Sequence, residues 1–152
     1  MFGKLFMGVR AVFCMAGRAK GTVAKEGVLQ YCVLAVLRHR DAYVFSQKGK
    51  RIIPLERRVL EGESDSEALS RMVLEESGLR LFQYERLDEF MRRDSLCKRK
   101  QHRVRVYGCV AAGEFSGQGW VWRFTEGELA GLPLDEKIRA YLAHVPIIGQ
   151  AR

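Results

Sequence analysis

The sequence has few cysteines, few prolines and no long apolar run. Its 152 residues include four cysteines and three prolines. The cysteines are Cys14, Cys32, Cys97 and Cys109. They form no C-x-x-C pair and are too sparse for a disulfide scaffold, so we expect reduced thiols. No stretch reaches the roughly 18 uninterrupted apolar residues of a spanning helix, which excludes a polytopic membrane protein and predicts no membrane partner.

The first 28 residues lack acidic side chains until Glu26. A mitochondrial-type presequence, a poor secretory signal interrupted by Arg10, a start codon placed too early and an ordinary basic arm all fit this composition. We therefore divide the chain into a basic N-terminal arm or targeting segment, 1–28, and one domain, 29–148. The expected location is cytoplasmic, or the mitochondrial matrix if the segment is a presequence.

Charge is unevenly distributed along the chain. The sequence has 26 lysines and arginines against 18 acidic residues, a formal net charge of +8, which favours anionic partners such as phosphates or nucleic acid. Against this background one segment is acidic and contains a single base, Arg71. Its carboxylates are Glu61, Glu63, Asp65, Glu67, Glu75 and Glu76.

Hydrophobic patterning predicts an α/β or α+β sandwich. Apolar runs predict strands at 31–37 and 43–45, joined as a hairpin and followed by a basic loop, and further strands at 81–90, 103–111 and 120–124. Ser64 and Glu67 form an S-x-x-E capping box and Gly78 suits a C-terminal cap, so a helix is expected over 64–78. A second helix is expected from about Pro133.

Glu75 and Glu76 share a stripe near the end of the predicted helix. Two such carboxylates repel each other unless a cation lies between them or solvent screens them. Hard oxygen ligands of this kind suit Mg²⁺ or Mn²⁺. A solvated helix face is the other interpretation of the same two residues.

The surrounding residues resemble the Nudix box, G-x5-E-x7-R-E-U-x-E-E-x-G-U, in which U is aliphatic. Seven of the nine specified positions agree. They are Glu63, Arg71, Val73, Glu75, Glu76, Gly78 and Leu79. The hairpin before the box and the strands and helix after it also resemble the family, and the tail is similar to MutT-type members and to the MutT-like domain of MutY. The resemblance implies a Nudix-type α/β/α sandwich with a mixed β-sheet flanked by helices.

Two positions depart from the box. Arg57 stands where the family has its opening glycine, and Met72 replaces the glutamate that follows the arginine. Methionine offers no hard oxygen to a metal ion. The site is therefore short of one carboxylate, and Glu114 lies in the loop where some members place a compensating acid.

The resemblance implies an acid anhydride hydrolase that uses Mg²⁺ or Mn²⁺ to cleave a nucleoside diphosphate-linked substrate, as MutT-like nucleoside triphosphate pyrophosphohydrolases do. Glu75, Glu76 and Arg71 are the expected catalytic group. The expected metal ligands are Glu75, Glu76, Glu63 and Glu114.

Substrate binding is expected from basic residues and from a base pocket. Lys50, Arg51 and Arg57 are expected to attract the phosphates. The resemblance places the base near Tyr31, Trp122 and Asp135, although Asp135 also suits the first turn of a helix.

The alternative function is a catalytically impaired Nudix domain that binds nucleic acid or a protein. The basic run Lys98, Arg99 and Lys100 favours nucleic acid, with binding that weakens as salt rises. The expected assembly is a monomer or a homodimer.

Overall fold

The computed structural model describes residues 29–93, 101–117 and 119–146. The N-terminal segment 1–28 and the basic run 98–100 lie outside these residues. The strands are β1 (Leu29–His39), β2 (Ala42–Lys48), β3 (Arg51–Ile53), β4 (Leu55–Arg58), β5 (Arg80–Arg93), β6 (Gln101–Ala112) and β7 (Val121–Thr125). The helices are α1 (Asp65–Ser77), α2 (Glu126–Ala130) and α3 (Glu136–Leu142).

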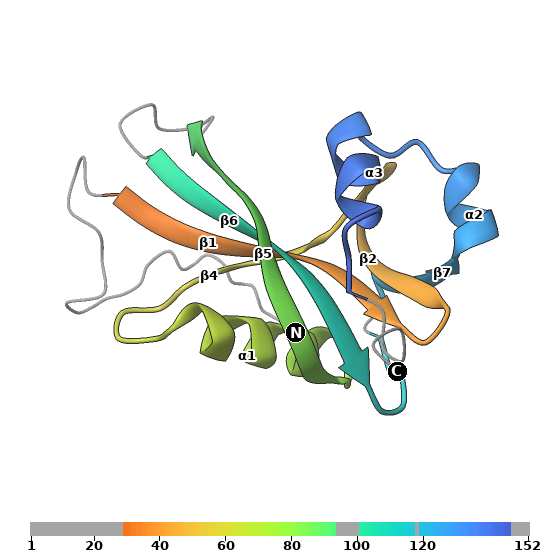
Figure 1. Ribbon diagram of the computed structural model, residues 1–152, viewed down its shortest axis with the longest axis horizontal. Helices are drawn as coiled ribbons and strands as arrows, with labels where there is room; N and C mark the ends of the chain where they lie inside the picture. The colour runs from red at the N-terminus through yellow and green to blue at the C-terminus, as the bar shows by residue number, and fades with distance from the viewer. Residues whose placement is uncertain (1–28, 94–100, 118, 147–152) are drawn as a thin grey trace.

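The strands form one seven-stranded mixed sheet (Figure 1). Its main path runs β3-β2-β1-β6-β5, with β4 paired to β1 and β7 paired to β2. β1 and β6 are parallel over their whole length, and the remaining pairs are antiparallel. This confirms the expected α/β fold with a mixed sheet and flanking helices.

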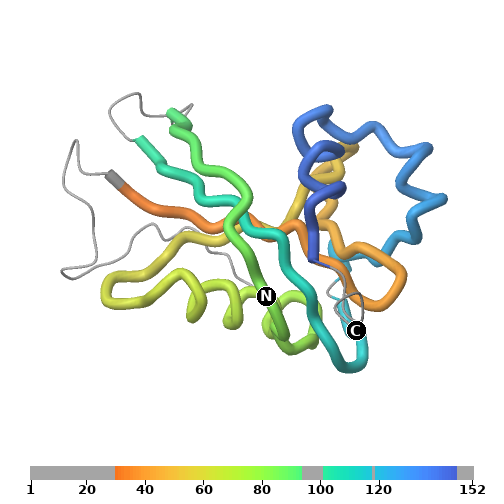
Figure 2. The backbone as a smooth tube through the Cα atoms, viewed as in Figure 1, coloured from red at the N-terminus to blue at the C-terminus, as the bar shows by residue number. Residues whose placement is uncertain are grey.

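β1 is buried on both faces, which explains its continuous apolar sequence. Val33, Ala35 and Leu37 pack in the cluster that contains the buried side of α1. Leu34 and Val36 point to the opposite face and pack in the cluster that contains residues of α2 and α3. Figures 1 and 2 show the resulting layers, with α1 on one side of the strands and α2 and α3 on the other.

Helix α1 begins and ends as its sequence predicts. The Ser64 side chain accepts a hydrogen bond from the Glu67 backbone N–H, and the Glu67 carboxylate accepts from the Ser64 N–H, which completes the capping box. At the other end Gly78 adopts a left-handed conformation, with φ of 73°, and its N–H donates to the Leu74 carbonyl. A Cβ added at Gly78 would lie 3.2 Å from the Ser116 Cβ.

The first turn of α1 is attached to β6 by Asp65. Arg105 Nη2 donates to Asp65 Oδ1 at 2.7 Å and the Tyr107 hydroxyl donates to Oδ2 at 2.6 Å. Burial and the neighbouring carboxylate raise the pKa of Tyr107 to about 12, so its hydroxyl keeps its proton. The Arg105 guanidinium lies 4.1 Å from the centre of the Tyr31 ring, which places Tyr31 on the α1 side of the sheet.

The structure departs from the predicted elements in three places. Residues 51–58, expected as a loop, include β3 and β4. Helix α2 was not expected, and the closing helix begins at Glu136 rather than near Pro133, with Asp135 as its N-cap. β4 has the sequence LERR, and such a charged segment becomes a strand only because β1 offers it an edge. Within the described residues no helix is both long and apolar enough to cross a membrane.

We predict that Gly78→Ala lowers the free energy of unfolding by about 1–2 kcal/mol, because alanine is strained in the left-handed conformation. Gly127→Ala is the matched control, since Gly127 lies in α2 with nothing within 4 Å of the added Cβ. That change should be neutral or slightly stabilising. Urea denaturation of both variants measures the difference, and equal effects would contradict the role assigned to Gly78.

Candidate functional site

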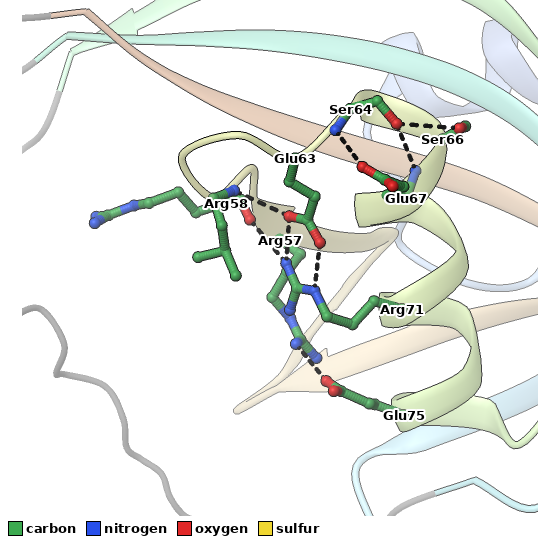
Figure 3. Close-up of polar contacts among 9 residues, drawn as sticks. Arg57, Arg58, Glu63, Ser64, Ser66, Glu67, Arg71 and Glu75 are labelled. Atoms are coloured by element: carbon green, nitrogen blue, oxygen red, sulfur yellow. Dashed lines mark hydrogen bonds and ion pairs between the residues drawn. The ribbon is translucent and has the colours of Figure 1, made fainter. Parts of the chain in front are cut away.

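Glu63 and Arg71 join the loop before α1 to the helix. Arg71 Nε donates to Glu63 Oε2 at 2.8 Å, and Arg71 Nη2 donates to Oε1 at 3.0 Å (Figure 3). The Leu60 backbone N–H also donates to Oε1, at 3.0 Å. The hydrogen bonds from Arg71 hold the pKa of Glu63 below its usual value, although partial burial opposes them. Both oxygens of Glu63 therefore serve to hold the loop against the helix.

Arg57 extends from β4 to the C-terminal half of α1 and contacts both neighbouring glutamates. Its Nη1 donates to Glu75 Oε1 at 2.7 Å and its Nη2 to Glu76 Oε2 at 2.6 Å. Figure 3 shows the Arg57 side chain directed at Glu75, whereas the Arg58 side chain points away from α1. One guanidinium thus binds two carboxylates through two separate nitrogens.

The pKa values of Glu76 and Arg57 depend on the charges beside them. Burial raises the pKa of Glu76, and the adjacent Arg57 opposes that rise. Burial alone would lower the pKa of Arg57, but pairing with Glu76 and Glu75 outweighs it and raises that pKa. Because the side chain of Glu76 is only 16% exposed, a nearby cation is needed to keep it charged.

Glu114 lies apart from this cluster. Its side chain is 95% exposed and its Oε2 lies 3.8 Å from Arg40 Nη2, a long surface contact. The backbone carbonyl of Glu114 lies near the C-terminal cap of α1, 3.6 Å from a Cβ placed on Gly78, but its carboxylate faces solvent.

A basic cleft of about 1340 Å³ lies on the side of the sheet opposite α1. It is lined by residues of β1, β2, β3 and β4, by Arg92 and His102, and by the segment that leads into α3. Its cations are Lys48, Lys50, Arg51, Arg57, Arg58 and Arg92, and its carboxylates are Glu56 and Asp135. Arg57 lines the edge of the cleft while its guanidinium reaches across to α1. The cleft therefore presents excess positive charge next to the cluster of Arg57, Glu75 and Glu76.

Four residues predicted to bind substrate line this cleft: Lys50, Arg51, Arg57 and Asp135. Asp135 also caps α3, since its Oδ1 accepts from the Lys137 N–H at 2.9 Å. Tyr31 and Trp122 are not among the lining residues. Side chains alternate along a strand, so Tyr31 lies on the α1 face and its neighbour Cys32 lies in the cleft.

Sequence reasoning missed the polar pairs inside the cleft. Arg92 forms an ion pair with Glu56, and Cys32 Sγ lies 3.8 Å from His102 Nδ1. Burial raises the pKa of the Cys32 thiol to about 11, which favours its protonated form at neutral pH. Glu56 faces Leu34 across the β1–β4 ladder, a pairing that no local pattern reveals.

Comparisons with known proteins were made on both sequence and structure. No family profile and no curated protein matches the sequence. A Nudix-family hydrolase from Clostridium perfringens is similar in structure, with a TM-score of 0.61, 17% identity, and coverage of 76% of this chain and 94% of that one. The MutT protein from Bacillus halodurans has a TM-score of 0.59 and 21% identity, covering 76% and 81%. A Nudix hydrolase from Nitrosomonas europaea has a TM-score of 0.56 and 18% identity, covering 78% and 91%.

The chain has the Nudix fold. The Nudix-box segment therefore lies where the sequence resemblance placed it, in the loop and helix α1 beside the central sheet. Glu63 and Arg71 form an ion pair between the loop and the helix, and the catalytic, metal-binding and substrate-binding roles expected of the site residues stay predictions.

The donors of this Nudix fold do not fit a divalent cation as they are arranged. The four expected ligands each pair with an arginine: Glu75 and Glu76 with Arg57, Glu63 with Arg71, and Glu114 with Arg40. Across 29–93, 101–117 and 119–146, no three histidine, cysteine or carboxylate side chains gather in a way that could hold a metal ion. Met72, at a box position that is usually acidic, is fully buried in the core beneath α1.

We predict that Glu63→Gln lowers the free energy of unfolding by about 1–2 kcal/mol at pH 7, because it removes the charge-assisted bonds to Arg71. The folded state lowers the pKa of Glu63, so this stabilisation is complete above the carboxyl pKa of the unfolded chain. The stabilisation is lost as the pH falls through the lowered pKa that Glu63 has in the folded state.

Urea titrations at pH 7 and in acid measure this effect. The difference in free energy of unfolding between wild type and Glu63→Gln should become smaller as the pH falls. Glu85→Gln, a change at an exposed position on β5, is the control and should show little effect at either pH. A gap that stays constant with pH would contradict the proposed ion pair.

Proposed function

We propose that this chain binds a nucleotide or another nucleoside diphosphate-linked small molecule in the basic cleft. The observation that carries the proposal is the charge of the lining, with six lysines and arginines against two carboxylates. One of those carboxylates, Glu56, is already paired with Arg92. Arg57 is paired with Glu75 and Glu76. Lys48, Lys50, Arg51 and Arg58 also line the cleft and can attract phosphate groups, and its volume of about 1340 Å³ has room for a nucleotide.

The cleft lining combines basic and apolar side chains, which supports binding of both the phosphates and the base of a nucleotide. Lys48, Lys50 and Arg51 lie at the β2–β3 turn and suit the phosphates. Leu134 and Ile138, near the start of α3, offer apolar surface to a base. Asp135 between them supplies a carboxylate that can accept a hydrogen bond from a base edge.

We predict that Arg51→Ala weakens nucleotide binding by about tenfold, because it removes one charge-assisted contact to phosphate. Isothermal titration calorimetry with ATP and with ADP-ribose measures the dissociation constants at two salt concentrations. The affinity of the wild type should fall as salt rises. Arg80→Ala is the control, since it removes the same charge from β5, outside the cleft lining. Equal losses in the two variants would contradict binding in the cleft.

A second candidate function is hydrolysis of such a molecule with Mg²⁺ or Mn²⁺, as a MutT-like pyrophosphohydrolase. Two observations favour it: the fold, and the position of Glu75 and Glu76 beside the cleft through their contact with Arg57. Catalysis of this kind requires Arg57 to leave both carboxylates, because metal coordination needs the same oxygens.

A product assay tests this second function. The hydrolase should release a nucleoside monophosphate in the presence of Mg²⁺ and lose that activity in Glu75→Gln. The panel comprises nucleoside triphosphates, sugar nucleotides, dinucleoside polyphosphates and capped RNA. Binding without turnover of any of them would remove the hydrolase and leave the binding function. Binding of nucleic acid through Lys98, Arg99 and Lys100 stays a separate prediction, since these residues lie outside the described part of the chain.

A further inference from the structure

Arg57 of β4 forms ion pairs with two neighbouring carboxylates of α1, Glu75 and Glu76. Glu75 and Glu76 are adjacent in the helix, and each carboxylate accepts a hydrogen bond from a different nitrogen of the Arg57 guanidinium. Without a cation between them, the two acids would repel each other and Glu76 would be buried with an uncompensated charge. The positive charge of Arg57 reduces the repulsion between the two carboxylates and compensates the buried charge of Glu76.

The strand register explains why the arginine reaches this position. Arg57 is opposite Val33 on β1, and Val33 is fully buried on the α1 face. Because neighbours across a ladder point to the same side, the Arg57 side chain must also point to α1. Arg58, next along the strand, pairs with Cys32 and faces the cleft.

A divalent ion at Glu75 and Glu76 would compete with this arginine directly. It would need the same carboxylate oxygens and would lie beside a positive charge held in place by β4. The third oxygen donor that could favour the ion is missing, because Met72 is an apolar residue of the core. The arrangement therefore favours the guanidinium over the metal.

We propose that the Arg57 guanidinium replaces the divalent cation at Glu75 and Glu76, and that phosphate groups in the cleft are bound by side-chain cations without a metal ion. The second half rests on the proposed function, while the first half concerns only this cluster. Arg57 and Lys48 both line the cleft, so the cluster borders the cations that are proposed to meet phosphate.

Mn²⁺ binding tests the first half. Electron paramagnetic resonance at about pH 8, where carboxylates are ionised, counts bound Mn²⁺ in the absence of nucleotide, and thermal denaturation is followed with and without the ion. Wild type should bind no Mn²⁺ at these glutamates and should melt at the same temperature with or without it. Arg57→Gln should melt at a lower temperature, and Mn²⁺ should raise that temperature because the two carboxylates have lost their cation.

Arg92→Gln is the matched control, since it removes another arginine of the cleft but exposes only one carboxylate, Glu56. It should show no response to Mn²⁺. Arg57→Lys keeps a positive charge and should behave like wild type toward Mn²⁺, which preserves the test if Arg57→Gln does not fold. Stoichiometric Mn²⁺ binding by wild type that is lost in Glu75→Gln, or the same Mn²⁺ response in Arg57→Gln and Arg92→Gln, would overturn the proposal.

Calorimetry with ATP in EDTA and in Mg²⁺ tests the second half. ATP should bind in EDTA at least as tightly as in Mg²⁺, because the metal-free nucleotide carries more negative charge. Binding seen only with Mg²⁺ would overturn metal-free recognition while leaving a nucleotide-binding function in place. Binding in neither buffer would contradict the proposed function itself, and the Mn²⁺ measurements would still decide the role of Arg57.

Discussion

Burial of β1 on both faces is the constraint on which the rest of the structure depends. Its alternate side chains enter two different apolar clusters, so a shift by one residue would move every side chain into the cluster on the opposite face and disrupt the packing of both. β4 and β6 take their register from β1. That register decides which side chains reach α1 and which reach the cleft, and it places the Arg57 guanidinium on one side of the sheet and Arg58 on the other.

Charged side chains differ between the α1 side of the sheet and the cleft side. The net charge of +8 conceals an acidic helix that is bound to basic residues of the sheet. Asp65 is held by Arg105 near the start of α1, and Glu75 and Glu76 are held by Arg57 near its end. Acids at both ends of α1 thus pair with arginines of the neighbouring strands, while Lys48, Lys50, Arg51 and Arg58 lie in the cleft on the other face.

Features that depend on short stretches of sequence could be predicted. The capping box at Ser64 and the C-terminal cap at Gly78 are local, and both ends of α1 were found where their residues indicate. The fold itself followed from the box together with the order of strands and helices.

Features that depend on pairing between distant strands could not be predicted. β4 is strongly charged, and only its ladder with β1 makes it a strand. The contact of Arg57 with two carboxylates follows from the register of β4 against β1, which no local pattern of sequence shows. Tyr31 lies on the α1 face and Cys32 in the cleft, an assignment that an uninterrupted apolar run does not reveal because it does not show which residues share a face.

The contact between Arg57 and α1 also limits how this sequence can change over evolutionary time. A glycine at this position would restore the Nudix-box residue, but the same substitution would detach β4 from the helix and leave Glu76 without its partner. Restoring an acid at Met72 would first require room for it in the core. Each of these two substitutions alone should therefore destabilise the present chain.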